Sequence, residues 1–122
     1  MTGFKLSTEP LAGGSILTVD GELDLCSCPE VVREAHRQMD EHGNRLVLDL
    51  TPTTFMDVAS LRLMEELHRS ADRAGGALVV VLPRPPACRL LDLLPPREDL
   101  RLVARLAEAR AAWRSAGLAD TA

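Results

Sequence analysis

A continuous apolar run from Ala77 to Leu82, with Leu78 to Val81 at its centre, constrains the fold more than any other feature of this chain. A strand that is apolar at every position must be covered on both faces, as central strands of parallel sheets are. This run belongs to a predicted strand from Ala77 to Leu82, and an earlier apolar run, Arg45 to Leu50, predicts a second strand. Apolar residues recur at helical spacing between them, from about Val58 to Ala74. Strand, helix and strand in this order predict a parallel pair joined by a crossover helix.

The rest of the chain predicts further elements of both kinds. Phe4 and Leu6 alternate with polar residues, as in a half-buried edge strand, and Ser15 to Asp20 reads as a strand antiparallel to it. A last short strand is expected from Leu100 to Val103. The other expected helices are Ser27 to His42, Ala87 to about Leu94, and Ala104 to Ser115.

These elements predict the α/β class, with a mixed, mostly parallel sheet of about five strands and about four α-helices packed on it. A chain of 122 residues is long enough for one domain with one core. We expect a single domain over residues 1–122, with an ordered core at about 4–116 and a flexible tail at 117–122.

Two helix starts carry capping signals. Ser27 and Glu30 have the spacing of a capping box, with Pro29 inside the first turn, where its missing donor costs nothing. Asp57 is well placed as the N-cap of the helix that follows it. The first turn of a helix exposes unpaired amides and the positive end of the dipole, so a hydroxyl there could carry a phosphoryl group.

Three segments of the chain resemble one family. Phe55-Met56-Asp57, followed by small residues and Leu61 at a helix start, is similar to the STAS domain, the fold of the anti-sigma factor antagonists. Gly21-Glu22-Leu23-Asp24, after an apolar strand, is a second match, and Arg89-Leu90-Leu91-Asp92-Leu93 is a weaker third. Together they span roughly residues 4 to 105 in the order that the family has.

The resemblance implies a binding module rather than an enzyme. Members of this type bind an anti-sigma factor, often a serine kinase, and phosphorylation of a serine in an Asp-Ser-Ser-Gly-Leu-like motif breaks that complex. In this chain Val58 stands at the acceptor position, Ala59 at the second small position and Ser60 at the usual glycine. Val58 has no hydroxyl, so the usual serine switch is expected to be absent. Ser60 and Thr54 are neighbouring hydroxyls, and Ser60 is the alternative acceptor.

A partner-binding face follows from the same motifs. Its expected members are Glu22, Asp24, Asp57, Val58, Ala59, Ser60 and Arg62. The expected partner is an anti-sigma factor or a serine kinase-like protein, and a homodimer is a further option. The alternative function is a STAS accessory subunit of an ABC-type lipid or solute transport system, and a purely structural relic is a third. Nucleotide binding has been proposed for the fold, but no pocket can be located from the sequence, and no cofactor is expected.

Charge and composition restrict the other possibilities. The net charge of −4 argues against a nucleic-acid partner, which would favour a basic face. Residues 1–61 carry 4 basic and 10 acidic side chains, a net −6, whereas residues 62–122 carry 10 and 8, a net +2. The acidic half holds both principal motifs, so a face there suits a basic partner. We find no apolar stretch of about 20 residues and no secretory signal at Met1 to Pro10, so a cytoplasmic protein without membrane insertion is expected.

Candidate catalytic and metal-binding residues are few. His36, His42 and His68 are read as surface or boundary residues rather than bases, and the usual phosphate-binding glycine motifs are missing. Cys26, Cys28 and Cys88 do not form a disulfide framework or a zinc motif. A redox role at Cys28 is left open because a helix N-terminus lowers a thiol pKa, but buried thiols in a reducing compartment are the simpler interpretation.

Overall fold

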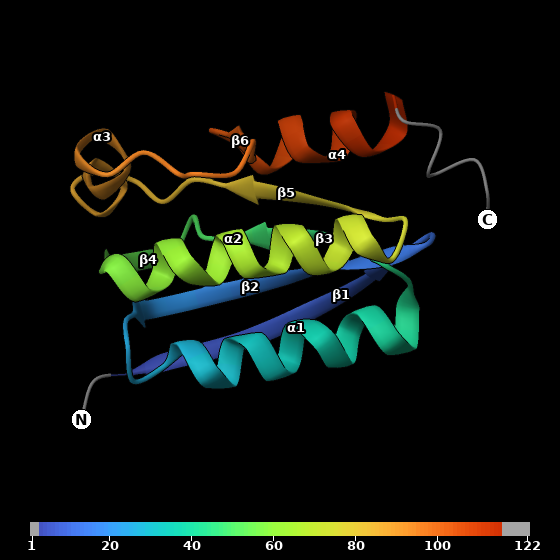
Figure 1. The fold of residues 1–122 in the computed structure, drawn as a ribbon, viewed down its shortest axis with the longest axis horizontal. Coiled ribbons are helices and arrows are strands. Elements are labelled where there is room, and N and C mark those ends of the chain that lie inside the picture. The colour runs from blue at the N-terminus through green and yellow to red at the C-terminus, as the bar shows by residue number, and fades with distance from the viewer. Residues whose placement is uncertain (1–2, 116–122) are drawn as a thin grey trace.

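The structure, a computed structural model, describes residues 3–115 and shows one six-stranded sheet with helices on both faces (Figure 1). β1 (Phe4–Leu11) pairs antiparallel with β2 (Gly14–Leu23). β3 (Arg45–Asp49), β5 (Ala77–Val81) and β6 (Arg101–Val103) continue the sheet in the order β1-β2-β3-β5-β6, and these pairings are parallel. β4 (Thr53–Met56) lies off this path and pairs in parallel with the end of β2.

Helices cover the two faces unequally. α1 (Cys28–His42) and α2 (Val58–Arg73) lie side by side on one face, and α4 (Leu106–Ser115) lies on the other (Figure 1). Each strand serves both faces because successive side chains of a strand point to opposite sides of the sheet. In β5, Val80 packs under α1 and α2, whereas Val79 and Val81 pack with Trp113 of α4. The apolar run of β5 is therefore a central strand that is covered on both sides.

Most predicted elements are confirmed, with small changes of extent. The antiparallel edge pair, the crossover helices and the central strand occur where the sequence predicts them. The helix predicted from Ala87 to Leu94 is a 3₁₀ turn, Ala87–Arg89, followed by α3 (Leu90–Leu93). α4 begins at Leu106, two residues later than predicted. The expected tail at 117–122 lies outside the described residues.

The fold class is confirmed, and β4 is the one strand of the sheet that the sequence analysis does not predict. The sequence analysis treats Thr51-Pro52-Thr53 as a loop, but Thr53 begins this strand and donates its hydroxyl to the Val19 carbonyl at 2.8 Å. The strand has four residues, too few for an alternating pattern to stand out. This strand positions the candidate site, because it fixes Phe55 and Met56 against the end of β2, directly before α2.

Within the described residues, no helix combines the length and the apolar character that crossing a membrane requires.

Candidate functional site

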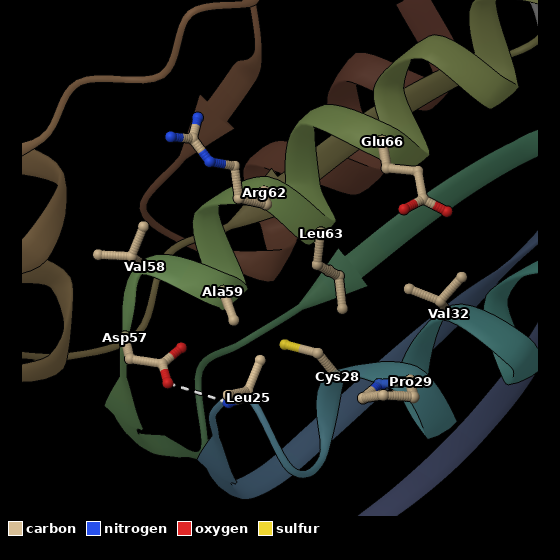
Figure 2. A pocket seen from close by; sticks show the side chains of 10 residues that line it. All are labelled: Leu25, Cys28, Pro29, Val32, Asp57, Val58, Ala59, Arg62, Leu63 and Glu66. Atoms are coloured by element: carbon tan, nitrogen blue, oxygen red, sulfur yellow. Dashed lines mark hydrogen bonds between the residues drawn. The ribbon is translucent and has the colours of Figure 1, made fainter.

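Asp57 joins two segments that are distant in sequence at the start of α2. It has the extended backbone conformation of an N-cap, and its Oδ1 accepts a hydrogen bond from the Ser60 amide at 3.2 Å. Its Oδ2 accepts a second hydrogen bond from the Leu25 amide at 2.9 Å (Figure 2). The predicted cap is confirmed, and the same carboxylate also fixes the loop between β2 and α1 against α2.

The Gly21-Glu22-Leu23-Asp24 motif forms the turn that brings this loop to α2. Gly21 has φ 108 at a β-bulge, and a Cβ there would lie 2.2 Å from the Gly3 carbonyl oxygen, so no other residue fits without a shift. Leu23 is fully buried. Asp24 Oδ1 accepts hydrogen bonds from the amides of Cys26 and Ser27, both at 3.0 Å. Asp24, like Asp57, therefore uses its carboxylate to fold the loop.

The predicted capping box at the start of α1 is wrong. Ser27 is the N-cap residue, but its side chain makes no capping bond to the helix. Its hydroxyl instead donates to the Glu22 carbonyl at 2.9 Å and accepts from the Asp24 amide at 3.0 Å. Asp24 accepts from the Ser27 amide, the donor that Glu30 would bind in a capping box, and the Glu30 amide donates to the Ser27 carbonyl. Pro29 does occupy the first turn, as predicted.

The three residues after Asp57 differ sharply in exposure. Val58, at the family's acceptor position, is 45% exposed, and Ala59 is partly buried. Ser60 is 0% exposed, and its hydroxyl donates to the Asp57 carbonyl. The only side chain at this helix start that carries a hydroxyl is thus turned inward, and a hydrocarbon side chain faces outward. Thr54, on β4, is exposed.

A groove of about 850 Å³ lies between the first turns of α1 and α2. Figure 2 shows Ala59 and Leu63 of α2 pointing toward Cys28 at the start of α1, whereas Val58 and Arg62 point away from α1. Most of its walls are apolar; the lining residues are Leu25, Cys28, Pro29, Val32, Asp57, Val58, Ala59, Arg62, Leu63 and Glu66. One turn farther along both helices, His36 Nε2 and Ser70 Oγ approach to 3.4 Å, and this contact joins the helices.

The large hydrophobic residues that are exposed in the described chain share a location. One lies on β4, and the others lie in segments that follow the carboxyl end of a strand. The exposed residues are Leu25, Phe55, Val58, Leu93 and Leu94. Because β2, β3, β4 and β5 are mutually parallel, their carboxyl ends share one edge of the sheet, where α2 begins (Figure 1). We call this set of five residues the apolar end. The sequence analysis identified only Val58 among them, because exposure of an isolated leucine or phenylalanine in a loop has no pattern in the sequence.

Charged groups beside the apolar end are largely paired. Arg62 Nη1 lies 3.3 Å from Glu65 Oε1, and the Arg97 amide donates to Glu65 Oε2 at 2.7 Å. The hydrogen bond from the Arg97 amide, with Arg62 beside it, lowers the pKa of the buried Glu65 carboxyl despite the opposing effect of burial. Glu22 is partly buried, and its carboxylate has no hydrogen-bond or ion-pair partner among residues 3–115.

The structure brings all seven predicted partner-binding residues around one end of α2. Glu22 pairs in register with Phe55, two residues before Asp57, and Asp24 precedes the Leu25 amide that Asp57 binds. They differ in accessibility, however, because Ser60 is buried and the carboxylates of Asp24 and Asp57 are occupied by backbone amides. Val58 and Arg62 are the two whose side chains are exposed, and the partly buried Glu22 carboxylate has no partner in the described chain.

The cysteines do not resemble a redox or metal centre. Cys28 lies at the start of α1, as predicted, but burial and the nearby carboxylates of Asp57 and Asp24 raise its pKa to about 12. Burial and the two carboxylates thus raise the pKa of Cys28, the direction opposite to the one that a redox role requires. Cys26 is exposed and Cys88 partly buried, and neither forms a disulfide. The described residues contain no cluster of histidine, cysteine and carboxylate side chains that could hold a metal.

Solved structures show the same fold. An anti-sigma factor antagonist from Mycobacterium paratuberculosis superposes with a TM-score of 0.79 at 24% identity, over 92% of this chain and 95% of that one. SpoIIAA, a Bacillus anti-sigma factor antagonist in its unphosphorylated form, gives 0.69 at 16% identity, over 94% and 97%. A form of RsbS from Moorella thermoacetica gives 0.74 at 16% identity, over 93% and 97%. At these identities the likeness establishes the fold, and no curated protein sequence matches the chain.

A comparison of the sequence with models of protein families identifies the family, which the structural likeness alone does not. The model of the STAS domain matches residues 6–109, from the edge strand β1 into α4. The matched range contains the Gly21–Asp24 turn, the Asp57 cap and the β4 strand that positions it. The chain therefore belongs to the STAS domain family.

Proposed function

We propose that this protein is a non-catalytic interaction module of the anti-sigma factor antagonist type. It binds an anti-sigma factor or a serine kinase-like protein in the cytoplasm and so regulates transcription, without the usual serine phospho-switch. The observation that carries the proposal is the apolar end, which contains Val58 at the position where relatives carry the acceptor.

Exposed hydrophobic residues that gather on one side of a protein are typical of a protein-binding surface. Val58 and Leu25 flank the start of α2, and Phe55 is held beside them by the pairing of β4 with β2. Their loops are fixed by the two hydrogen bonds of Asp57, so the surface is ordered before a partner binds. Such preorganisation lowers the entropic cost of association.

The absence of a switch follows from the chemistry of the helix start. A kinase needs an accessible hydroxyl, but the exposed side chain is valine and the nearby serine is fully buried with its hydroxyl engaged by the Asp57 carbonyl. Val58 also lacks the charge of a phosphoserine. The surface therefore resembles the unmodified state, the one in which a relative such as unphosphorylated SpoIIAA was solved.

Co-purification from the native host tests this function. The wild-type chain, Val58→Glu and a control, Ala111→Glu on the exposed face of α4, are used as baits, and captured proteins are identified by mass spectrometry. We expect an anti-sigma factor or serine kinase-like protein with the wild type and the control, and its loss with Val58→Glu. Capture of a transport ATPase in its place would favour the accessory-subunit alternative and overturn the proposal.

A further inference from the structure

The groove between α1 and α2 adjoins the outward ridge of α2, because Val58 and Arg62 line its rim while their side chains point away from α1 (Figure 2). We propose that this groove binds an amphipathic helix of a protein partner, with the apolar stripe of that helix inserted between α1 and α2 and a lysine or arginine placed against Glu66. The inference rests on the proposed role as a protein-binding module and adds a second contact to it.

The shape of the groove suits a helix. α1 follows β2 and precedes β3, α2 follows β4 and precedes β5, and these strands are parallel, so the two helices run side by side in one direction. On α2 the lining extends from Val58 to Glu66, about 12 Å at 1.5 Å per residue. That length accommodates about two turns of a third helix, whose side chains at positions i, i+3, i+4 and i+7 would enter the groove.

Charge identifies the kind of helix. The charged residues that line the groove are Asp57, Arg62 and Glu66. Asp57 is occupied by two backbone amides, and Arg62 lies against the carboxylate of Glu65. Glu66 is exposed and has no hydrogen-bond or ion-pair partner in the described part of the chain. A helix that presents a cation at this end of its apolar stripe would pair with Glu66, and one that presents a carboxylate would be repelled.

Two other occupants fit the groove less well. A small apolar ligand is usually oriented by several convergent polar groups, but here the Asp57 carboxylate and the Arg62 guanidinium are already engaged. A second copy related by a two-fold axis would present the same surface to itself. The concave walls around Ala59 and Leu63 would then face each other and leave the groove unfilled.

A designed peptide tests the inference without knowledge of the natural partner. The probe is an 18-residue amphipathic helix with leucines at helical spacing and lysines on the polar face, and a matched peptide has glutamates in place of the lysines. Titration of the full chain, followed by fluorescence anisotropy and backbone NMR shifts, should show binding of the lysine peptide with shifts at residues 28–32 and 59–66. The glutamate peptide should bind at least tenfold more weakly.

Two exposed leucines provide a matched pair of variants. Leu25, at the mouth of the groove, is 72% exposed, and Leu93, on α3 outside it, is 79% exposed. Leu25→Ser should weaken peptide binding about tenfold because an apolar contact is lost, and Leu93→Ser should leave it unchanged. Glu66→Gln should weaken it about two- to fivefold, an effect that disappears at high salt.

Several results would overturn the inference. These are equal affinity for both peptides, equal effects of Leu25→Ser and Leu93→Ser, a dimer in sedimentation that Leu25→Ser dissociates, or groove shifts produced by decanoate but not by the lysine peptide. Failure here leaves the proposed function standing if Val58→Glu still abolishes capture of the natural partner. Conversely, peptide binding with no anti-sigma-type partner captured would reject the proposed function alone.

Discussion

Replacement of Asp57 gives the sharpest test of how the recognition surface is built. The carboxylate makes two hydrogen bonds with different purposes, one to the Ser60 amide within α2 and one to the Leu25 amide across the sheet edge. Asp57→Ala removes both, and Asp57→Asn keeps one acceptor oxygen. Because asparagine is as good an N-cap as aspartate, the Asn variant should lose only the bond to Leu25.

The two bonds are expected to contribute similar amounts. Loss of an N-cap costs about 1 kcal/mol, within a range of roughly 0.5–2 kcal/mol. The bond to the Leu25 amide is charge-assisted but exposed, so we assign it about 1 kcal/mol. At about 2.1 cal/mol/K per residue, a chain of 122 residues loses about 4 °C of Tm per kcal/mol. Asp57→Ala should therefore lower Tm by about 8 °C, and Asp57→Asn by about 4 °C.

Thermal unfolding followed by circular dichroism measures these shifts. The control is Asp40→Ala on α1, where the exposed carboxylate has no partner among the described residues and alanine favours the helix, so Tm should not fall. The reasoning is refuted if Asp57→Ala melts with the wild type. Equal losses in the Ala and Asn variants would show that only one of the two bonds stabilises the fold.

Three further predictions concern the surroundings of the site. Iodoacetamide at mildly alkaline pH should label exposed Cys26 and leave Cys28 unmodified, because the pKa of Cys28 is raised to about 12. Comparable labelling of the two cysteines in peptide mass spectrometry would contradict this. The pKa of Glu65 is lowered from 4.5, so its ionised form stabilises the fold above pH 4.5, and this contribution is lost as pH falls through the folded-state pKa. The cost of Glu65→Gln in urea unfolding should therefore be largest near neutral pH and should decrease as pH falls below 4.5. A cost independent of pH would argue against this. Gly21→Ala should lower the free energy of unfolding by more than about 2 kcal/mol, because the added Cβ would meet the Gly3 carbonyl. Gly75→Ala, at φ 79 in open space, should lower it by about 1 kcal/mol. Equal losses would show that the contact with Gly3 contributes nothing to the cost.

The layered fold could be predicted because its strands and long helices carry strong periodic signals. The continuous apolar run of β5 and the helical spacing along α2 are direct consequences of burial on two faces and on one. β4 was not predicted because four residues are too short for periodicity, and its pairing with β2 depends on a bulge at Gly21 that only the three-dimensional register reveals.

The site was predictable in part, for a related reason. Asp57 was assigned correctly because an N-cap is a local feature, whereas its bond to the Leu25 amide joins residues 32 positions apart and has no local signal. The capping box at Ser27 is absent because Asp24, three residues earlier, binds the Ser27 amide, and the Ser27 hydroxyl donates to the Glu22 carbonyl. The burial of Ser60 beside the exposed Val58 follows from the direction in which α2 leaves β4, which the sequence does not specify.

The central claim is that an exposed valine, Val58, stands where relatives carry a phosphorylated serine, so that the switch is absent. Phosphate mapping at the start of α2 tests this claim. The wild type and Val58→Ser are incubated with ATP and the kinase-type partner captured from the host, and the segment of residues 54–62 is examined by mass spectrometry. We predict no phosphate on the wild-type segment and phosphate at the substituted position in the variant. Phosphate on Ser60 or Thr54 of the wild type would contradict the account.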